Sequence, residues 1–263
     1  MSLEILTRTP AGTPRPTPLL FIHGAYTGAW CWDEYFLPWF AQRGYEAHAV
    51  SLRGHGASPA PGIPDFAGLD DYVADVILAA SSLRAPSVLI GHSMGAMIAQ
   101  RAARRCGARA MALLAPVPPH GLSTSLFALA TRDPPLFLAL NALQLTNGTN
   151  AETLKRVRDY LFSQSLSEAE AYRHLTRTQR ESSRALAELA WPQHLWIRPS
   201  LGLPTLVLGA ERDAFLTPQM VQEAALFHGV QPRMLPEMAH MMMLEAGWQA
   251  VASAIEEWLE TLE

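Results

Sequence analysis

The chain has 263 residues, of which 49% are hydrophobic and 17% charged. This size and composition fit one large domain, or one domain with an insertion, and they exclude a disordered chain. The formal net charge of −4 argues against nucleic acid as the partner, because it provides no basic field. Two cysteines, Cys31 and Cys106, are too few for a disulfide framework or a cysteine-based metal site.

The first 18 residues contain four prolines and no apolar core, so no secretory signal peptide is predicted. A membrane span needs about 18 or more consecutive apolar residues, and no such run is present. The nearest candidate, residues 126–145, is interrupted by Arg132 and Asp133 and by a Pro-Pro pair. We therefore expect a cytoplasmic protein without a membrane span.

Short apolar runs define the predicted strands in chain order. The first, residues 2–7, ends at a Pro-rich segment. The second, residues 19–22, is continuously apolar, which is typical of a strand buried on both faces of a parallel sheet. Further strands are predicted at residues 45–52, 87–90, 110–114, 204–209 and 232–235. Apolar residues at helical spacing predict helices at residues 33–42, 69–83, 94–105, 218–227 and 247–262. This alternation predicts an α/β fold with a mostly parallel, doubly wound sheet.

Residues 117–200 interrupt the alternation of strands and helices. Several helical segments follow one another there, the longest of them predicted over residues 167–191. A helical block of this size between two strands predicts a cap that is inserted into an α/β core. We assign residues 1–116 and 201–263 to the core and residues 117–200 to the cap.

One short stretch carries the strongest chemical signal. An apolar strand leads into residues 91–95, Gly-His-Ser-Met-Gly, and a helix is predicted to follow. Gly-x-Ser-x-Gly in this context is the pattern of a nucleophile elbow, a sharp strand-to-helix turn that presents a serine hydroxyl. The two glycines supply the missing side chains that the close approach of strand and helix requires. Ser93 is therefore the candidate nucleophile.

A serine hydroxyl becomes a nucleophile when a histidine accepts its proton, and that histidine needs a carboxylate to orient it. Asp213 follows the strand predicted at 204–209, and His240 follows the strand predicted at 232–235. The chain order serine, acid, histidine is the one found in sheet-based hydrolases of this kind. All three lie after the carboxyl ends of strands, where doubly wound sheets build their sites. Glu211 is an alternative acid.

The other histidines receive different roles. His228 competes with His240, but it lies at a predicted helix end, where we expect it to interact with the helix dipole. We expect His92 to point away from the pocket. No pair of histidines has metal-ligand spacing, so no metal site is predicted. Structural, surface or packing roles are expected for the remaining ones, which are His23, His48, His55, His120, His174 and His194.

Outside residues 117–200, the chain resembles the α/β-hydrolase superfamily, and in particular its serine esterases and lipases. The resemblance is carried by residues 23–24 (His-Gly), 53–58 (Arg-Gly-His-Gly-Ala-Ser), 91–95, 209–213 (Gly-Ala-Glu-Arg-Asp) and 239–240 (Ala-His). Residues 23–32, His-Gly-Ala-Tyr-Thr-Gly-Ala-Trp-Cys-Trp, are also similar to plant methylesterases and hydroxynitrile lyases. The resemblance implies that the backbone N–H groups of Ala25 and Met94 form an oxyanion hole. Because Met94 opens a helix, its N–H group lacks an intrahelical partner and can stabilise negative charge.

Together these features predict a serine hydrolase with the triad Ser93, His240 and Asp213 and with no cofactor. Its expected partner is a small-molecule ester or acyl substrate, and no feature specifies an oligomeric state. The apolar cap residues favour a hydrophobic substrate. The residues predicted to line the pocket are Tyr26, Trp30, Met241, Phe127 and Phe137.

Three alternatives stay open. A perhydrolase or haloperoxidase-like enzyme and a carbon–carbon bond hydrolase would use the same triad, and a non-catalytic ligand receptor could retain the same fold. A hydroxynitrile lyase of the plant type ranks lower. By resemblance it would need a lysine near the catalytic histidine, and the only lysine, Lys155, lies in the predicted cap.

Overall fold

The computed structural model describes residues 2–60, 66–145, 151–193 and 202–262. Its strands form one sheet in the order β1-β3-β2-β4-β5-β6-β7. Every neighbouring pair is parallel except β1 and β3, which are antiparallel. The strands are β1 (Ile5–Arg8), β2 (Leu19–Ile22), β3 (Ala47–Val50), β4 (Val88–His92), β5 (Ala110–Leu114), β6 (Thr205–Ala210) and β7 (Arg233–Leu235). The predicted α/β class and mostly parallel sheet are confirmed.

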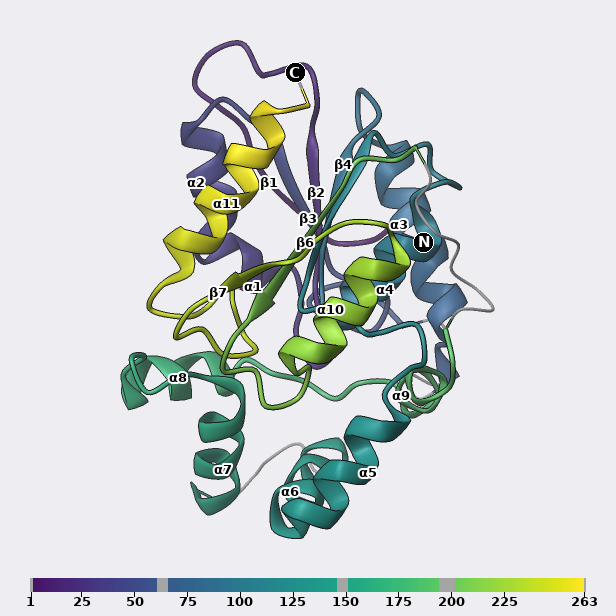
Figure 1. Cartoon of the computed structure of the whole chain (residues 1–263). Helices are drawn as coiled ribbons and strands as arrows, with labels where there is room; N and C mark the ends of the chain where they lie inside the picture. Colours follow the sequence, from purple (N-terminus) through teal and green to yellow (C-terminus); the bar gives the residue numbers. More distant parts are fainter. Residues whose placement is uncertain (1, 61–65, 146–150, 194–201, 263) are drawn as a thin grey trace.

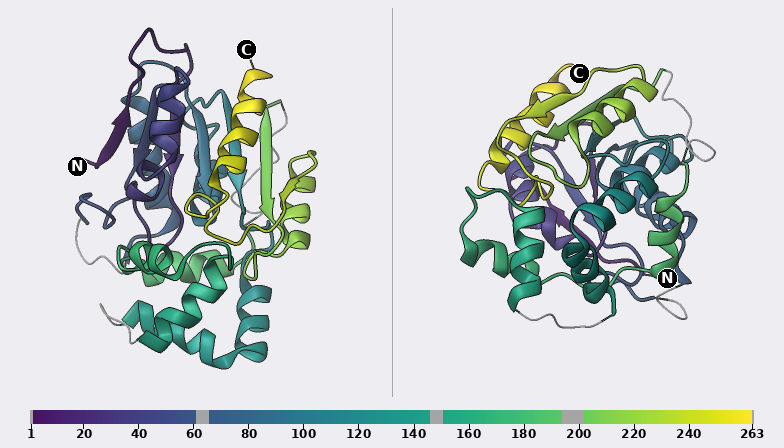
Figure 2. Two further views of the ribbon diagram at one scale, coloured as in Figure 1. Left: turned by 90° about the vertical axis from the view of Figure 1, so that its left-hand side faces the viewer. Right: turned by 60° about the horizontal axis from the view of Figure 1, so that its bottom comes forward.

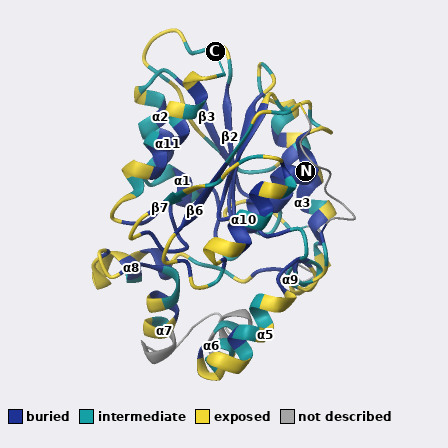
Figure 3. Cartoon of the chain, viewed as in Figure 1, coloured by how far each residue is buried: buried dark blue, intermediate teal, exposed yellow. Residues whose placement is uncertain are grey.

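Helices cover both faces of the sheet, as Figure 1 shows. One face carries α1 (Trp30–Asp33), α2 (Phe36–Gln42) and α11 (Trp248–Glu260), and the other carries α3 (Leu69–Ser81), α4 (Met94–Ala102) and α10 (Pro218–Phe227). Strands β2, β3, β4 and β5 are buried along their whole length, and Figure 3 shows this buried centre. Continuous apolar runs such as Leu19–Ile22 form strands here because both faces of the sheet exclude water.

The remaining helices form the cap between β5 and β6. They are α5 (Ser123–Arg132), α6 (Pro134–Leu145), α7 (Ala151–Leu161), α8 (Glu168–Leu175) and α9 (Ser183–Ala190). Figures 1 and 2 show that α5, α6, α7 and α8 lie beyond one end of the sheet, where they cover its loops. The inserted helical cap agrees with the prediction. Its predicted end at residue 200 and the restart of the core at residue 201 lie outside the described residues, as does His194.

Two helix predictions were wrong in extent. The helix predicted over residues 33–42 is divided into α1 and α2, and the long helix predicted over 167–191 is divided into α8 and α9. The second break occurs because Ser182 has an extended backbone and its hydroxyl caps α9 by accepting the N–H of Ala185. Residues 176–182 therefore leave the helix and contact the core loops described below. No helix in the described part of the chain combines the length and apolar character needed to span a bilayer.

Candidate active site

Ser93 lies in the sharp turn between β4 and α4. Its backbone has φ 52° and ψ −117°, a strained conformation for a residue with a side chain, and its N–H donates to the carbonyl of Leu114 at 2.9 Å. A Cβ atom on Gly91 would collide with the carbonyl of Gly95, and one on Gly95 would collide with the carbonyl of Ile22. Glycine is required at both positions because β4, α4 and β2 approach one another so closely.

His240 and Asp213 are paired. The distance between His240 Nδ1 and Asp213 Oδ2 is 2.7 Å, and both residues are buried. The other carboxylate oxygen, Oδ1, accepts the N–H groups of Phe215 and Leu216, each at 2.8 Å. Because a carboxylate oxygen accepts, a neutral His240 that bonds to Asp213 donates from Nδ1. The alternative acid, Glu211, is exposed.

His92 lies against His240, which differs from the expectation that it points away from the pocket. The two ring centroids are 4.8 Å apart, and His92 Nε2 is 2.9 Å from the carbonyl oxygen of His240. Burial and the neighbouring His240 ring hold the pKa of His92 well below its ordinary value. A neutral His92 therefore donates from Nε2 and fixes the main chain of His240. His92 is the last residue of β4, and it reaches His240 because β4 ends beside the loop that follows β7.

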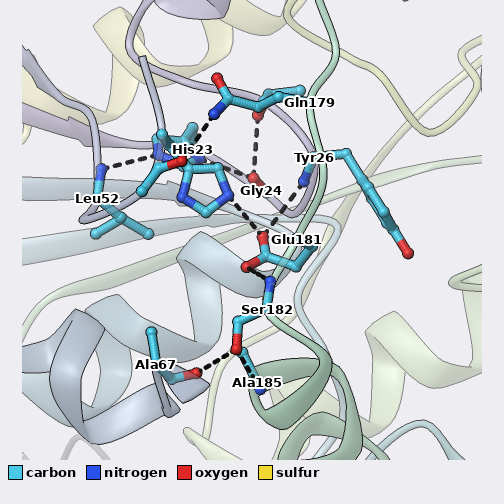
Figure 4. Close-up of polar contacts among 12 residues, drawn as sticks. His23, Gly24, Tyr26, Leu52, Ala67, Gln179, Glu181, Ser182 and Ala185 are labelled. Atoms are coloured by element: carbon cyan, nitrogen blue, oxygen red, sulfur yellow. Dashed lines mark hydrogen bonds and ion pairs between the residues drawn. The ribbon is translucent and has the colours of Figure 1, made fainter. Parts of the chain in front are cut away.

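The peptide between Gly24 and Ala25 is held in one orientation. The carbonyl of Gly24 accepts His23 Nδ1–H at 2.8 Å and the hydroxyl of Thr27 at 3.0 Å. His23 Nε2 accepts the N–H of Leu52 at 3.0 Å, and burial, with a smaller effect from His55, lowers the pKa of His23 to about 3. Figure 4 shows this arrangement. Because the N–H and C=O of a trans peptide point in opposite directions, pinning the carbonyl aims the N–H of Ala25 away from it.

The two N–H groups expected to form the oxyanion hole have no acceptor among the described residues. Within the described residues, the N–H groups of Ala25 and Met94 donate no hydrogen bond. Ala25 lines the same cavity as Ser93, and Met94 directly follows Ser93 at the start of α4. Unpaired donors beside a nucleophile are suited to stabilise an oxyanion.

Ser93 and His240 line the same cavity, which has a volume of about 520 Å³ and lies under the cap. Three of the predicted pocket residues, Tyr26, Trp30 and Met241, line it. Phe127 and Phe137 do not line it: the Phe127 side chain is 72% exposed on α5, and Phe137 packs partly buried against the core. The side chain of Phe127 lies on the solvent-exposed side of α5. The prediction that Phe127 and Phe137 line the pocket was therefore wrong. The cavity-lining residues that the sequence analysis did not predict include Tyr160, Leu161, Phe162, Leu175 and Phe215.

His174 has the packing role expected of it and also lines the cavity, whereas His228 differs from its predicted role. His174 lines the cavity and is buried beside the rings of Trp30 and Phe162. Burial, together with the charge of Arg173, lowers its pKa to about 4. His228 is buried, lies 2.6 Å from Gln100 Oε1, and has its pKa lowered to about 4 by burial. Since His228 is neutral, it makes a side-chain hydrogen bond instead of serving the helix dipole as a cation.

No group of three or more His, Cys, Asp or Glu side chains in the described residues is arranged to hold a metal ion. Cys31 is buried, and burial raises the pKa of its thiol to about 12, so it is not a thiolate nucleophile.

Comparison with known proteins gives the family. A model described as the alpha/beta hydrolase family matches residues 19–254, whereas no curated protein sequence matches the chain. Similar solved structures include a thermophilic esterase from Thermogutta terrifontis, with 20% identity, a TM-score of 0.73, and coverage of 99% of this chain and 93% of that one. A monoacylglycerol lipase from Paleococcus ferrophilus has 17% identity, a TM-score of 0.72 and 100% coverage of both chains.

A third similar structure is an esterase from Exiguobacterium antarcticum, with 16% identity and a TM-score of 0.74, covering 98% of this chain and 95% of that one. At these identities the three structures demonstrate a shared fold. The family model covers most of the chain, including Ser93, Asp213 and His240. The chain therefore belongs to the alpha/beta hydrolase family.

Proposed function

We propose that this protein is a serine hydrolase that cleaves a carboxylic ester or a similar acyl bond of a small hydrophobic substrate. The observation that carries the proposal is the 2.7 Å contact between His240 Nδ1 and Asp213, in a cavity that Ser93 also lines. A buried carboxylate that holds Nδ1–H leaves the basic Nε2 of the imidazole to accept the proton of the serine hydroxyl.

The proposed reaction has two halves. Ser93 Oγ attacks the substrate carbonyl while His240 Nε2 takes the hydroxyl proton, and the N–H groups of Ala25 and Met94 stabilise the oxyanion. The tetrahedral intermediate collapses, and the alcohol leaves with the proton from His240. Water then attacks the acyl-Ser93 ester in the same way, and this step releases the acid and restores the serine.

The apolar lining of the cavity favours a substrate with a hydrophobic acyl group. The cap contributes the apolar side chains of Leu140, Leu154, Val157, Leu161 and Phe162. A volume of about 520 Å³ lies in the range of small-molecule sites. The neighbours that are esterases or lipases are consistent with this assignment.

The test is hydrolysis of p-nitrophenyl esters from acetate to decanoate by the wild type and by Ser93→Ala. We expect the wild type to turn over at least one of these esters and Ser93→Ala to lose about 10⁴-fold or more in kcat, because residual catalysis comes only from binding and the oxyanion hole. Ester hydrolysis that survives in folded Ser93→Ala would contradict the proposal.

A further inference from the structure

The segment between α8 and α9 connects the cap to two core loops (Figure 4). The backbone N–H of Gln179 donates to the carbonyl of Tyr26 at 2.9 Å. Its side-chain oxygen accepts the N–H of Gly56 at 2.9 Å, and its Nε2 donates to the carbonyl of Gly54 at 2.8 Å. One cap residue therefore holds both the loop after β2 and the loop after β3.

Two residues later, the carboxylate of Glu181 has hydrogen-bond donors on both of its oxygens. Its Oε1 accepts the hydroxyl of Tyr72 at 2.5 Å and the N–H of Ser182 at 2.8 Å. Its Oε2 lies 3.1 Å from His55 Nε2 and accepts the N–H of Tyr26 in a longer bond of 3.4 Å. Glu181 is only 1% exposed. A carboxylate buried this deeply is stable only where such partners replace its hydration.

Glu181 and His55 form an ionised pair. Burial disfavours the charged form of His55, but the Glu181 carboxylate outweighs it and raises the pKa of His55. Burial likewise opposes ionisation of Glu181, and the His55 charge with the surrounding hydrogen bonds outweighs it and lowers the pKa of this carboxyl. His55 Nδ1 lies 3.2 Å from the carbonyl of Arg53, so both ring nitrogens have a partner that accepts. The charge of His55 therefore holds the Glu181 carboxylate in its position.

The residue held by this segment is strained and adjoins the oxyanion donor. Tyr26 has φ +65°, a left-handed conformation that a residue with a side chain keeps only where its surroundings hold it. Its N–H bonds to Glu181 and its carbonyl accepts from Gln179. Fixing the Ala25–Tyr26 peptide limits rotation about the backbone of Ala25, and therefore limits the direction of the Ala25 N–H.

We propose that Glu181 is a positioning residue for catalysis: from the cap, it holds the backbone of Tyr26 so that the N–H of Ala25 faces the developing oxyanion. The loop's other support, the hydrogen bonds that His23 and Thr27 make to the carbonyl of Gly24, comes from the core. Catalysis in this protein thus depends on a carboxylate outside the triad and outside the core. This inference rests on the proposed hydrolase function.

The experiment compares Glu181→Ala and Glu181→Gln with a matched control, Glu188→Gln. Glu188 is a cap carboxylate of α9 that also accepts a core N–H, that of Leu69 at 2.7 Å, but it does not touch the loop. Steady-state kinetics on the best p-nitrophenyl ester are normalised to the folded fraction, measured by circular dichroism. Inhibition by a boronic acid, which forms a tetrahedral adduct with the serine, reports on the oxyanion hole directly.

Loss of a whole oxyanion donor costs about 10²–10³ in kcat, so a misdirected donor in Glu181→Ala should lower kcat about 10-fold to 100-fold. We expect KM to change less than about twofold, because the effect belongs to the transition state. Boronic acid affinity should fall in parallel. Glu181→Gln should lose less kcat, since its amide oxygen can still accept from Tyr26, and Glu188→Gln should match the wild type.

The inference is overturned if the Glu181 variants keep kcat within about twofold of the wild type, or if only KM rises. If Glu181→Ala does not fold, Glu181→Met decides alone, because it nearly preserves the side-chain volume and removes the oxygen that accepts from the N–H of Tyr26. Failure of the proposed function gives a different result, since wild-type ester hydrolysis would then survive in Ser93→Ala.

Discussion

Replacing Asp213 with asparagine should trap His240 in the wrong tautomer. The two backbone N–H groups of Phe215 and Leu216 donate to Oδ1 at 2.8 Å each, so the amide oxygen of the introduced asparagine must occupy that position. The amide NH₂ then takes the place of Oδ2, 2.7 Å from His240 Nδ1. Two donors cannot face each other, so His240 must move its proton to Nε2, where it can no longer accept the proton of Ser93.

The magnitude follows from the loss of the base. A wrong tautomer in a triad of this kind lowers kcat about 10⁴-fold, which is about 5.4 kcal/mol of transition-state stabilisation at 1.36 kcal/mol for each factor of ten. The assay is kcat on the best p-nitrophenyl ester, together with the rate of labelling by a fluorophosphonate. The fold should survive, because the asparagine oxygen satisfies both backbone donors.

The control is Glu211→Gln, which changes the exposed carboxylate in the same loop and should leave kcat within about twofold of the wild type, as a surface change does. A folded Asp213→Asn enzyme that keeps kcat within about tenfold of the wild type would refute the reasoning. The same holds if Glu211→Gln shows the larger loss, because Glu211 would then be the acid.

Three further predictions concern stability and selectivity. Gly95→Ala should lower the free energy of unfolding by about 1–3 kcal/mol or more, because the added Cβ meets a carbonyl of β2. The control Gly12→Ala should not, because no atom lies within 4 Å of its added Cβ. Equal stability of the two variants in urea unfolding would contradict this prediction. Phe162→Ala should shift the preferred acyl chain to greater length at a cost of about 3–5 kcal/mol in the free energy of unfolding, and an unchanged chain-length profile would remove Phe162 from the acyl site. The stabilisation from the Glu181–His55 pair should be lost as pH falls through the lowered pKa of Glu181 and as pH rises through the raised pKa of His55. Urea unfolding against pH should show a smaller loss of stability at both the acid and the alkaline end in Glu181→Gln than in the wild type; the loss at acid pH that comes from the buried His23, His174 and His228 should be the same in both proteins.

The candidate site could be predicted where its signals are local in sequence. Ser93 is marked by two glycines that the close approach of β4, α4 and β2 requires. Asp213 and His240 each follow a short strand, and the parallel sheet carries the ends of those strands to one edge. Chain order and strand ends therefore contain enough information to bring these residues together without knowledge of the cap.

The cap contributions could not be predicted in this way, because they depend on how helices pack. Phe127 belongs to an apolar helix, but helical periodicity does not specify which face meets the core, and this side chain is exposed. Residues 167–191 have a composition that favours one helix, so the extended segment carrying Gln179 and Glu181 was missed. Ser182 could have indicated the break, because it is a second N-cap residue, after Ser167, within residues 167–191. His92 was misplaced because its orientation depends on where the loop after β7 lies.

Covalent labelling tests the central claim most directly. A fluorophosphonate reacts with a serine hydroxyl only where a neighbouring base and oxyanion donors activate it. Intact mass and peptide mapping should show one adduct per chain, located on Ser93 and absent from Ser93→Ala. An unmodified wild-type protein, or an adduct that persists in Ser93→Ala, would contradict the account.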